Sequence, residues 1–520
     1  MSDAFDQGIT VTEMAAMDQP TDVLRETTAA FVGRALRGPL NEPVLLKSFG
    51  DFRRRFGDVW SRSSLGPAAQ HFFSHGGKRL YVVRVANNAR GALICLPAEG
   101  SALVLRALEP GSTERIRAAV DYDSIDDDNE ELFNLTLQRI DPANRMVQDQ
   151  EYFRAVSYRE DNRNFVANVL TTSELARVER PLPTHRPECS SGPNLPFNHH
   201  YVEQTQEGAD GHELSDYDLV GSRLHRKGLF ALDKVDRFDI LYLPPPGKHR
   251  DLGATSLLAA ERFCRRRGAM LVVDPPASWQ SASEAILGIR DLGLASPNIV
   301  SYFPRMRRRD DESVPRAAGA ALAGMLCKLD RQHGAWQPLD QKGVAFDRAM
   351  MPAAELSDDQ VQSLLREGLN VIAPGPAGAA RLLGSVTLSR GSETHRRFSS
   401  LPVRRLCLQI LQTIEETTRW AVFEIGNARL AARIRAQVAG YLAWLADLGA
   451  FDDAEFIVEC DADLHQTAGD TGWGFAIFVA FHPLGCPEPV SFTLHQSVEG
   501  CRVASTAFAP GSQGQAREAI

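Results

Sequence analysis

The chain has 520 residues, of which 43% are hydrophobic and 24% charged, values that are ordinary for a folded globular protein. This length is too great for one hydrophobic core, so two to four domains are expected. A net charge of −9 argues against general nucleic-acid binding, and no apolar run is long enough to span a bilayer. Eight scattered cysteines form no C-x-x-C motif, which indicates reduced thiols in a protein made in the cytoplasm.

The first twenty residues are polar, and they lack the apolar stretch of a secretory signal. They contain one alternating piece, GITVTE, in which Ile9 and Val11 fall on one side of a strand. An isolated strand is unstable alone, so we expect it to pair with a sheet elsewhere.

Gly33 and Gly38 are separated by four residues, as in a phosphate-binding loop. Such a loop continues with Lys and then Ser or Thr, whereas Pro39 and a leucine follow here. Pro39 also lacks the backbone N–H that a phosphate cradle needs. We therefore expect Gly33, Gly38 and Pro39 to shape structural turns, between a strand at 29–33 and a second one at 42–48.

Four further regions follow in chain order. A short helix with a phenylalanine face at 49–57 leads to a strand at 79–87. Residues 97–235 combine short strands and a helix with polar loops, of which 180–217 is the longest. From about 236 to 390, strands and amphipathic helices alternate, which is typical of a parallel, partly wound sheet. Two long helices and several strands complete the chain at about 395–500.

Three features have residue types found in chemical sites. Asp274 ends an apolar strand, where an α/β enzyme could place a metal or substrate ligand, but the sequence has no P-loop and no G-x-S-x-G motif. The favoured interpretation is that "DPP" turns the chain out of the strand. The acidic run 121–131 lacks the turn glycine of a calcium loop, so a solvated loop is favoured. A histidine- and cysteine-containing loop matches no common zinc spacing. Its candidate ligands are His185, Cys189, His199 and His200.

An ordered set of segments closely resembles contractile tail sheath proteins, which occur in myophage tails, R-type pyocins and extracellular contractile injection systems. The set begins with TTAAFVGRALRGPLNEPVLLKSFGDFRRRFGD and GPAAQHFFSHGGKRLYVVRV. It continues with RFDILYLPPP, RRRGAMLVVDPPASW and NIVSYFPRM, and it resumes in LPVRRLCLQILQTIEETTRWAVFE. The resemblance covers nearly the whole chain and is weakest in residues 97–235.

The resemblance implies a mixed α/β, multidomain fold, in which the N-terminal and C-terminal parts together build an inner domain and the middle is inserted facing outward. The expected divisions are an N-terminal extended arm at 1–20, the first part of the inner domain at 21–96, an outer strand-rich insertion at 97–235, a middle α/β domain at 236–394, the second part of the inner domain at 395–487, and a C-terminal arm and tail at 488–520.

The resemblance implies a mechanical function with no catalytic, cofactor or metal site. Such subunits polymerise as stacked hexameric rings around an inner tube and contract to drive that tube through a target cell envelope. The implied partners are copies of the chain in a six-fold helical sheath, the inner tube protein, and baseplate and terminal cap proteins, with no nucleic acid and no direct membrane insertion. Assembly in the bacterial cytoplasm is implied, within a phage tail or a phage tail-like particle that can be released.

Two strands suit donation to the sheets of neighbouring subunits, because main-chain hydrogen bonds survive rotation of whole domains. The N-terminal strand consists of Ile9, Thr10, Val11, Thr12 and Glu13. The C-terminal strand consists of Val490, Ser491, Phe492, Thr493, Leu494 and His495. Two alternatives stay open at this point: an α/β enzyme with a site near Asp274, and a tube or baseplate protein of the same machine.

Overall fold

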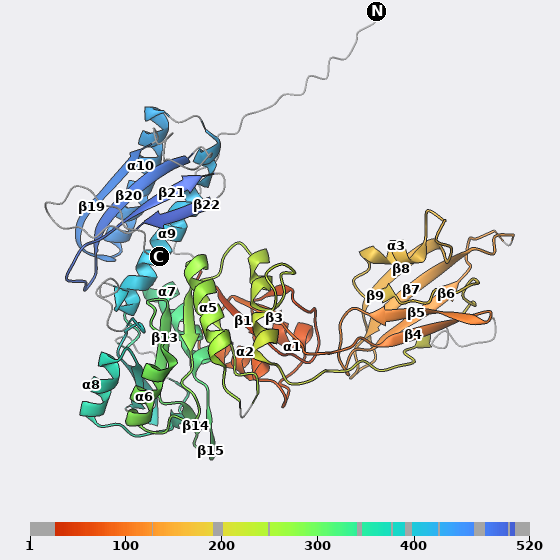
Figure 1. Ribbon diagram of the computed structural model, residues 1–520, viewed down its shortest axis with the longest axis horizontal. Coiled ribbons are helices and arrows are strands. Elements are labelled where there is room, and N and C mark those ends of the chain that lie inside the picture. The colour runs from red at the N-terminus through yellow and green to blue at the C-terminus, as the bar shows by residue number, and fades with distance from the viewer. Residues whose placement is uncertain are drawn as a thin grey trace, which may run out of the picture. The chain divides into compact units, whose positions relative to one another are not determined.

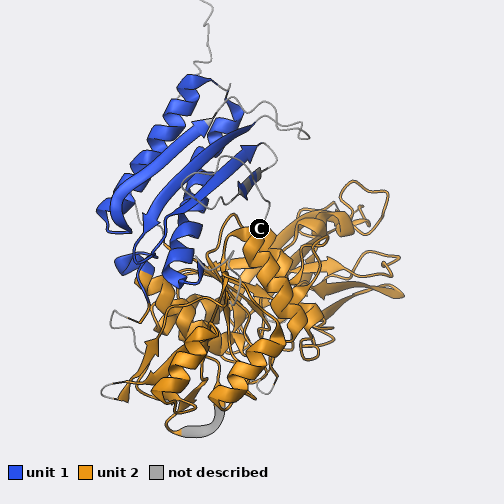
Figure 2. Cartoon of the chain, turned by 60° about the vertical axis from the view of Figure 1, so that its left-hand side comes forward, with its two compact units in different colours: residues 1–25, 330–338, 391–520 blue, residues 26–329, 339–390 orange. Residues whose placement is uncertain are grey.

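The computed structural model describes residues 26–126, 128–190, 201–247, 250–340, 346–375, 378–389, 398–424, 427–461, 474–497 and 500–504. The chain divides into two compact units (Figure 2). The larger unit comprises residues 26–329 and 339–390, and the smaller unit comprises residues 1–25, 330–338 and 391–520. The mixed α/β, multidomain fold predicted from the sequence is therefore confirmed.

An eight-stranded sheet organises the larger unit, in the order β18-β17-β13-β12-β11-β1-β3-β2. Its six inner strands are parallel, and β2 and β18 are antiparallel strands at the two edges. The strands are β1 (Ala29–Gly33), β2 (Pro43–Leu46), β3 (Leu80–Arg84), β11 (Ile240–Tyr242), β12 (Met270–Val273), β13 (Ile299–Phe303), β17 (Asn370–Pro374) and β18 (Ala380–Leu383). Because parallel strands are covered on both faces, they read as continuous apolar runs in the sequence.

The pairing of β1 corrects one expectation. β1 is bonded to β3 on one side and to β11 on the other, so residues 29–84 share a sheet with the α/β region. The expectation that residues 21–96 and 395–487 form one domain is wrong for the part of the chain that is described. The apolar repeat of AAFVG could not show this, because any neighbouring buried strand satisfies it equally well.

Helices cover both faces of this sheet. One face packs against α4 (Asp216–Val220), the 3₁₀ helix η3 (Gly228–Lys234), α5 (Ala254–Arg267), α6 (Ala282–Leu292) and α8 (Asp358–Arg366). The other face carries Phe31, whose ring meets those of Phe72 and Tyr242 at 5.4 and 5.1 Å. Helices α1 (Phe49–Phe56) and α2 (Leu65–Ser74) follow β2, and α7 (Gly319–His333) starts beside Tyr242.

A strand-rich insertion leaves the sheet after β3 (orange and yellow in Figure 1). It holds two antiparallel sheets, β4-β5-β9 and β10-β6-β7-β8, around their own core. Its elements are β4 (Leu93–Ala98), β5 (Ser101–Ala107), β6 (Ile116–Asp121), β7 (Leu132–Ile140), β8 (Val147–Ser157), α3 (Val166–Val169), η1 (Leu170–Thr172), β9 (Ala176–Val178) and β10 (Val202–Glu203).

The insertion ends earlier than the expected boundary at residue 235. The chain returns to the α/β sheet through bridges that join Arg90 to Ala209 and Asn87 to His212. Leu219, Leu229 and Leu232, which follow, are buried in the core of the α/β sheet. Residues 214–235 therefore belong to the α/β part, and the insertion covers about 92–203.

A smaller antiparallel sheet adjoins the α/β part. It runs in the order β15-β14-β16 and consists of β14 (Met306–Arg308), β15 (Asp311–Arg316) and β16 (Met350–Pro352). Ser357 caps the start of α8, which follows this sheet in the chain, with a capping box in which its hydroxyl accepts a hydrogen bond from the Gln360 N–H.

The guanidinium of Arg84 joins the insertion to the sheet. Arg84 ends β3 and is 1% exposed, and burial lowers its pKa to about 10. Its nitrogens donate to the carbonyls of Ala35, Leu36 and Gly38 and to that of Pro110, which lies in the insertion. One buried cation thus binds the loop after β1 and the first residues beyond β5.

The Gly38 turn is held from both sides. The Gly38 carbonyl accepts from Arg84 Nη1 at 2.6 Å, and the Gly38 N–H donates to Glu109 Oε2 at 2.9 Å. Gly38 has φ 101°, and an added Cβ would lie 2.8 Å from Phe56 Cδ1. Gly38, followed by Pro39, thus lies in a bend of the loop between β1 and β2. Gly33 is instead the last residue of β1, where an added Cβ would lie 3.3 Å from Leu65 Cβ, so the predicted turn there is wrong.

The smaller unit is a four-stranded antiparallel sheet, β19-β20-β21-β22, with two long helices (Figure 2, blue). Its elements are α9 (Leu401–Thr418), η6 (Arg419–Phe423), α10 (Ala428–Asp447), β19 (Phe451–Asp461), β20 (Gly474–Pro483), β21 (Val490–Ser497) and β22 (Gly500–Ala504). Alternate residues of the central strands, such as Ile477 and Phe492, pack against the apolar faces of α9 and α10. The helices and strands predicted at 395–500 are confirmed.

Replacing Gly38 with Ala should lower the free energy of unfolding by about 1–3 kcal/mol, because alanine is strained at this φ and its methyl group meets Phe56. Gly50→Ala is the matched control. Gly50 lies in α1 with only Ser48 Oγ near an added Cβ, at 3.5 Å, so this change should be neutral or stabilising. Equal effects of the two changes in urea unfolding would contradict the assignment of Gly38.

Candidate functional site

In open α/β sheets, ligands bind beyond the carboxyl ends of the strands, where the strand order reverses. Here the reversal lies between β11 and β1. The start of α7 packs at that point: a Cβ added to Gly319 would lie 2.4 Å from the Tyr242 ring. The chain's own helix therefore occupies the place where a nucleotide binds in other folds of this kind.

Asp274, which follows β12, is used to hold this helix. Its Oδ1 accepts hydrogen bonds from the N–H groups of Ala318 at 3.0 Å and Gly319 at 2.8 Å. Its Oδ2 accepts from the Tyr242 hydroxyl at 2.6 Å. Both oxygens are thus engaged in structural contacts, and the carboxylate stabilises the positive end of α7.

Burial sets the ionisation of this carboxyl. It raises the pKa of Asp274, although Arg305 and the three hydrogen bonds act in the opposite direction. The pKa of Tyr242 is raised well above its usual value by burial and by the adjacent carboxylate. Such shifts also occur at catalytic sites, but here the partners are a phenol and the first amides of a helix, which do not form a nucleophile with a base.

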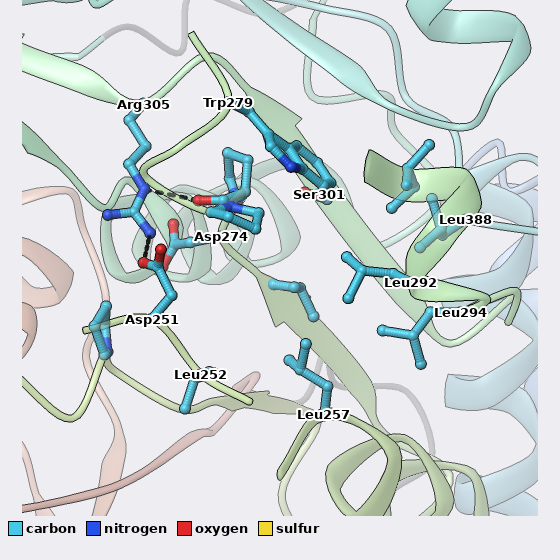
Figure 3. Close-up of a pocket in the computed structure, with 15 residues that line it drawn as sticks. Asp251, Leu252, Leu257, Asp274, Trp279, Leu292, Leu294, Ser301, Arg305 and Leu388 are labelled. Carbon is cyan, nitrogen blue, oxygen red and sulfur yellow. Dashed lines mark hydrogen bonds and ion pairs between the residues drawn. The ribbon is translucent and has the colours of Figure 1, made fainter. Parts of the chain in front are cut away.

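A cavity of about 40 Å³ adjoins Asp274 (Figure 3). Leucines form its apolar wall, and an ion pair between Arg305 and Asp251 closes one side. Arg305 Nε also donates to the Pro275 carbonyl at 2.7 Å. The space suits one or two waters and is far below the volume that binds a cofactor or metabolite.

The candidate metal ligands lie only partly within the described residues. His185 Nδ1 lies 3.1 Å from the Glu99 carbonyl, Cys189 is exposed, and His199 and His200 lie outside the described residues. No cluster of three or more His, Cys, Asp or Glu side chains suited to a metal occurs within the described ranges. All eight cysteines are free thiols, and four of them are buried.

The two predicted arms have different outcomes. Val490–His495 lies in β21, which is bonded to β20 on one side and to β22 on the other. Both of its edges are used within the chain, so the expectation that this strand pairs with a neighbouring subunit is wrong. The N-terminal strand at Ile9–Glu13 lies outside the described residues, and its donation stays a prediction.

A second ionic group, which the sequence reasoning missed, lies beside Arg84. The carboxylate of Glu109 forms ion pairs with Arg55 at 3.1 Å and Arg139 at 3.3 Å, and Arg139 Nε donates to Glu114 at 2.8 Å. The available signal was a charged residue at the end of an otherwise apolar run, as Arg84 in LYVVR. Buried charges need paired partners, so such a residue predicts an ionic junction.

Asp274→Asn should reveal the raised pKa as a pH dependence of stability. Because the folded pKa is raised, the carboxyl contributes stability that is fully present below the unfolded pKa of about 3.9 and is lost as pH rises through the folded value. The asparagine variant should therefore gain stability relative to the wild type as pH rises. Urea unfolding of both proteins at a series of pH values above about 3.9 measures the difference in their free energies of unfolding.

Asp141→Asn is the control of opposite sign. The pKa of Asp141 is lowered, chiefly by the hydrogen bond from the Ala143 N–H, so its contribution to stability grows as pH rises from the lowered folded value to the unfolded value of about 3.9. This variant should lose stability relative to the wild type as pH rises through that lower range, below the range in which Asp274→Asn gains it. Parallel curves for the two variants would contradict the assignment of Asp274.

No helix in the described ranges is long and apolar enough to cross a membrane. Neither a scan against protein-family models nor a search of curated proteins finds a match.

Solved structures do match, over almost the whole chain. A sheath tail protein from Listeria innocua is similar with a TM-score of 0.59 at 15% identity, over 91% of this chain and 95% of that one. A sheath tail protein from Desulfitobacterium hafniense has a TM-score of 0.52 at 13% identity, over 92% and 98%. The contracted helical sheath of the anti-feeding prophage has a TM-score of 0.51 at 15% identity, over 93% and 97%. The chain therefore has the fold of contractile tail sheath proteins.

Proposed function

We propose that the chain is a structural subunit of a contractile sheath. Copies would stack as hexameric rings around an inner tube, and contraction would drive that tube through a target cell envelope. The observation that carries the proposal is the match to sheath structures along more than nine-tenths of the chain, with no large part of either protein left over.

The interior of the larger unit supports a mechanical function. The crevice at the reversal of strand order is filled by α7, and Asp274 is occupied in holding that helix. A subunit of this kind needs no bound nucleotide, since the work of contraction comes from a metastable lattice whose interfaces improve. A heterologous contact repeated by a screw operation generates such a lattice.

Strand donation supplies the links between subunits in this proposal. In the smaller unit β21 is internal, so the sheet offers the outer edges of β19 and β22. Exposed acids on β19, including Glu455 and Glu459, oppose the addition of another strand. We therefore place the N-terminal strand of a neighbouring copy on the edge of β22, where about four to six hydrogen bonds at a net ~1 kcal/mol each would hold it.

The remaining partners follow from the same proposal. A sheath of this kind requires an inner tube protein, and baseplate and terminal cap proteins at its ends. Assembly would take place in the bacterial cytoplasm, with the finished particle a phage tail or a related extracellular machine.

The purified chain, alone or with its tube protein, should form six-fold helical cylinders visible by negative-stain electron microscopy. The expectation rests on heterologous contacts between copies, which build open assemblies rather than closed dimers. Monodisperse monomers at every salt and protein concentration, with the tube protein present, would count against the proposed function.

Deleting residues 1–20 should leave the midpoint of thermal unfolding nearly unchanged and should abolish long cylinders, because the deleted strand is proposed to pair only with a neighbouring copy. Val11→Pro should act similarly if its N–H lies in the ladder, whereas Val11→Ala keeps that N–H and is the matched control. A truncated chain that unfolds, or one that still forms long cylinders, would show that the links lie elsewhere.

A further inference from the structure

A tight turn at residues 222–227 projects from the larger unit and is termed here the cationic finger. Two hydrogen bonds close it, from Ser222 N–H to the Lys227 carbonyl at 3.2 Å and from Lys227 N–H to the Ser222 carbonyl at 2.9 Å. Gly221 and Gly228 flank it with φ 69° and 64°, and a Cβ added to Gly221 would lie 2.2 Å from the Lys227 carbonyl oxygen. The finger is thus a fixed turn between α4 and η3.

The finger presents charge and one apolar side chain to solvent. Arg223, Arg226 and Lys227 are exposed, and no ion pair is found for them among the described residues. Leu224 lies between them and is 87% exposed. Three cations around an exposed leucine form a compact surface that nothing in the described part of this unit covers.

A surface of the opposite charge lies on the smaller unit, along edge strand β19. Ile457 and Glu459 face the same side of the regularly paired part of β19, and the exposed Asp453 and Glu455 precede them where the register with β20 shifts; these four residues are termed the acidic stripe. Ile457 is 46% exposed between two glutamates, which have no ion-pair partner within the described ranges. In the register with β20, Ile457 lies opposite Ala480 and Glu459 lies opposite Phe478. Neither Ile457 nor Glu459 belongs to the core that this sheet forms with α9 and α10, so both side chains face away from the helices.

We propose that the cationic finger of one copy docks on the acidic stripe of a second copy. The two surfaces are opposite in charge, and each carries one exposed aliphatic side chain among its charges. The inference rests on the proposed function, since it needs copies of the chain to meet. It adds a specific contact to the strand links, one that acts between the larger unit of one subunit and the smaller unit of the next.

Charge on an edge strand also has a simpler explanation, because it discourages unwanted strand addition. That explanation accounts for Glu455 and Glu459. It leaves the exposed Ile457 between them unexplained, together with Leu224 at the tip of a fixed cationic turn. A docking contact accounts for the two aliphatic residues as well as the charges.

The contact joins two different surfaces, so it is heterologous. When copies join through such a contact, the copy at one end keeps a free finger and the copy at the other end keeps a free stripe. Further copies can therefore add until a ring closes or a helix grows. Its electrostatic part is screened by salt, with a Debye length of about 10 Å at 0.1 M, so association should weaken as salt rises.

The test uses full-length chains with reversed charges. The finger variant is Arg223→Glu, Arg226→Glu and Lys227→Glu. The stripe variant is Asp453→Lys, Glu455→Lys and Glu459→Lys. A charge-matched control carries the same change in net charge at exposed positions away from the finger. Its substitutions are Lys78→Glu, Arg163→Glu and Arg262→Glu.

Self-association is measured by sedimentation velocity at low and high salt. Each reversed variant alone should associate about tenfold more weakly than the wild type at low salt, because three weak ion pairs are replaced by repulsions. An equimolar mixture of the two should recover association, since an acidic finger then meets a basic stripe. The charge-matched control should associate like the wild type, and Leu224→Ser should weaken association without changing its salt dependence.

Either of two results overturns the contact: reversed variants that associate as strongly as the wild type, or a mixture that stays as dissociated as each variant alone. A mixture that stays dissociated is the result expected if the finger and the stripe meet within a single chain, or if the finger binds another acidic partner. Wild-type chains that never associate would overturn the proposed function itself. Cylinders that persist with unchanged affinity in the reversed variants would overturn only this contact.

Discussion

The buried guanidinium of Arg84 is the interaction on which the larger unit depends. It lies at the carboxyl end of β3, and its donors bind carbonyls from the loop after β1 and from the start of the insertion. A buried cation without these acceptors would be strongly unfavourable, so the loop, the Gly38 turn and the insertion must take up their positions together. Glu109 extends the same junction by binding the Gly38 amide and two further arginines.

Among the described residues, the same α/β sheet has no open ligand crevice at the point where its strand order reverses. Helices cover both faces, α7 occupies the usual ligand crevice, and Asp274 serves as an acceptor for the first amides of that helix. A fold type that commonly hosts catalysis here carries an insertion joined to it by the buried hydrogen bonds of Arg84. Function in the proposed sheath would then lie on outer surfaces, at strand edges and charged patches, rather than in an internal cavity.

Local elements followed from the sequence more readily than their arrangement. The periodicities of α5, α9 and α10, and the glycine that ends α5, placed helices close to where they occur. The partners of β1 and β21 could not be predicted in this way, because an apolar strand fits equally well beside any strand of suitable length. The assignment of Asp274 required coordinates, since a carboxylate that ends a strand can bind a ligand or hold a helix. Arg84 was missed because a single charge after an apolar run is also common at exposed strand ends.

A sheath built from this chain, as proposed, must change length while its subunits stay linked. Cryo-electron microscopy of the chain assembled with its tube protein, before and after triggering, would measure both properties. Two helical lattices are expected, one long and narrow and one short and wide, with the same strand pairing between copies in both. A single lattice that never shortens, or two lattices whose subunits share no continuous strand link, would contradict the proposed sheath.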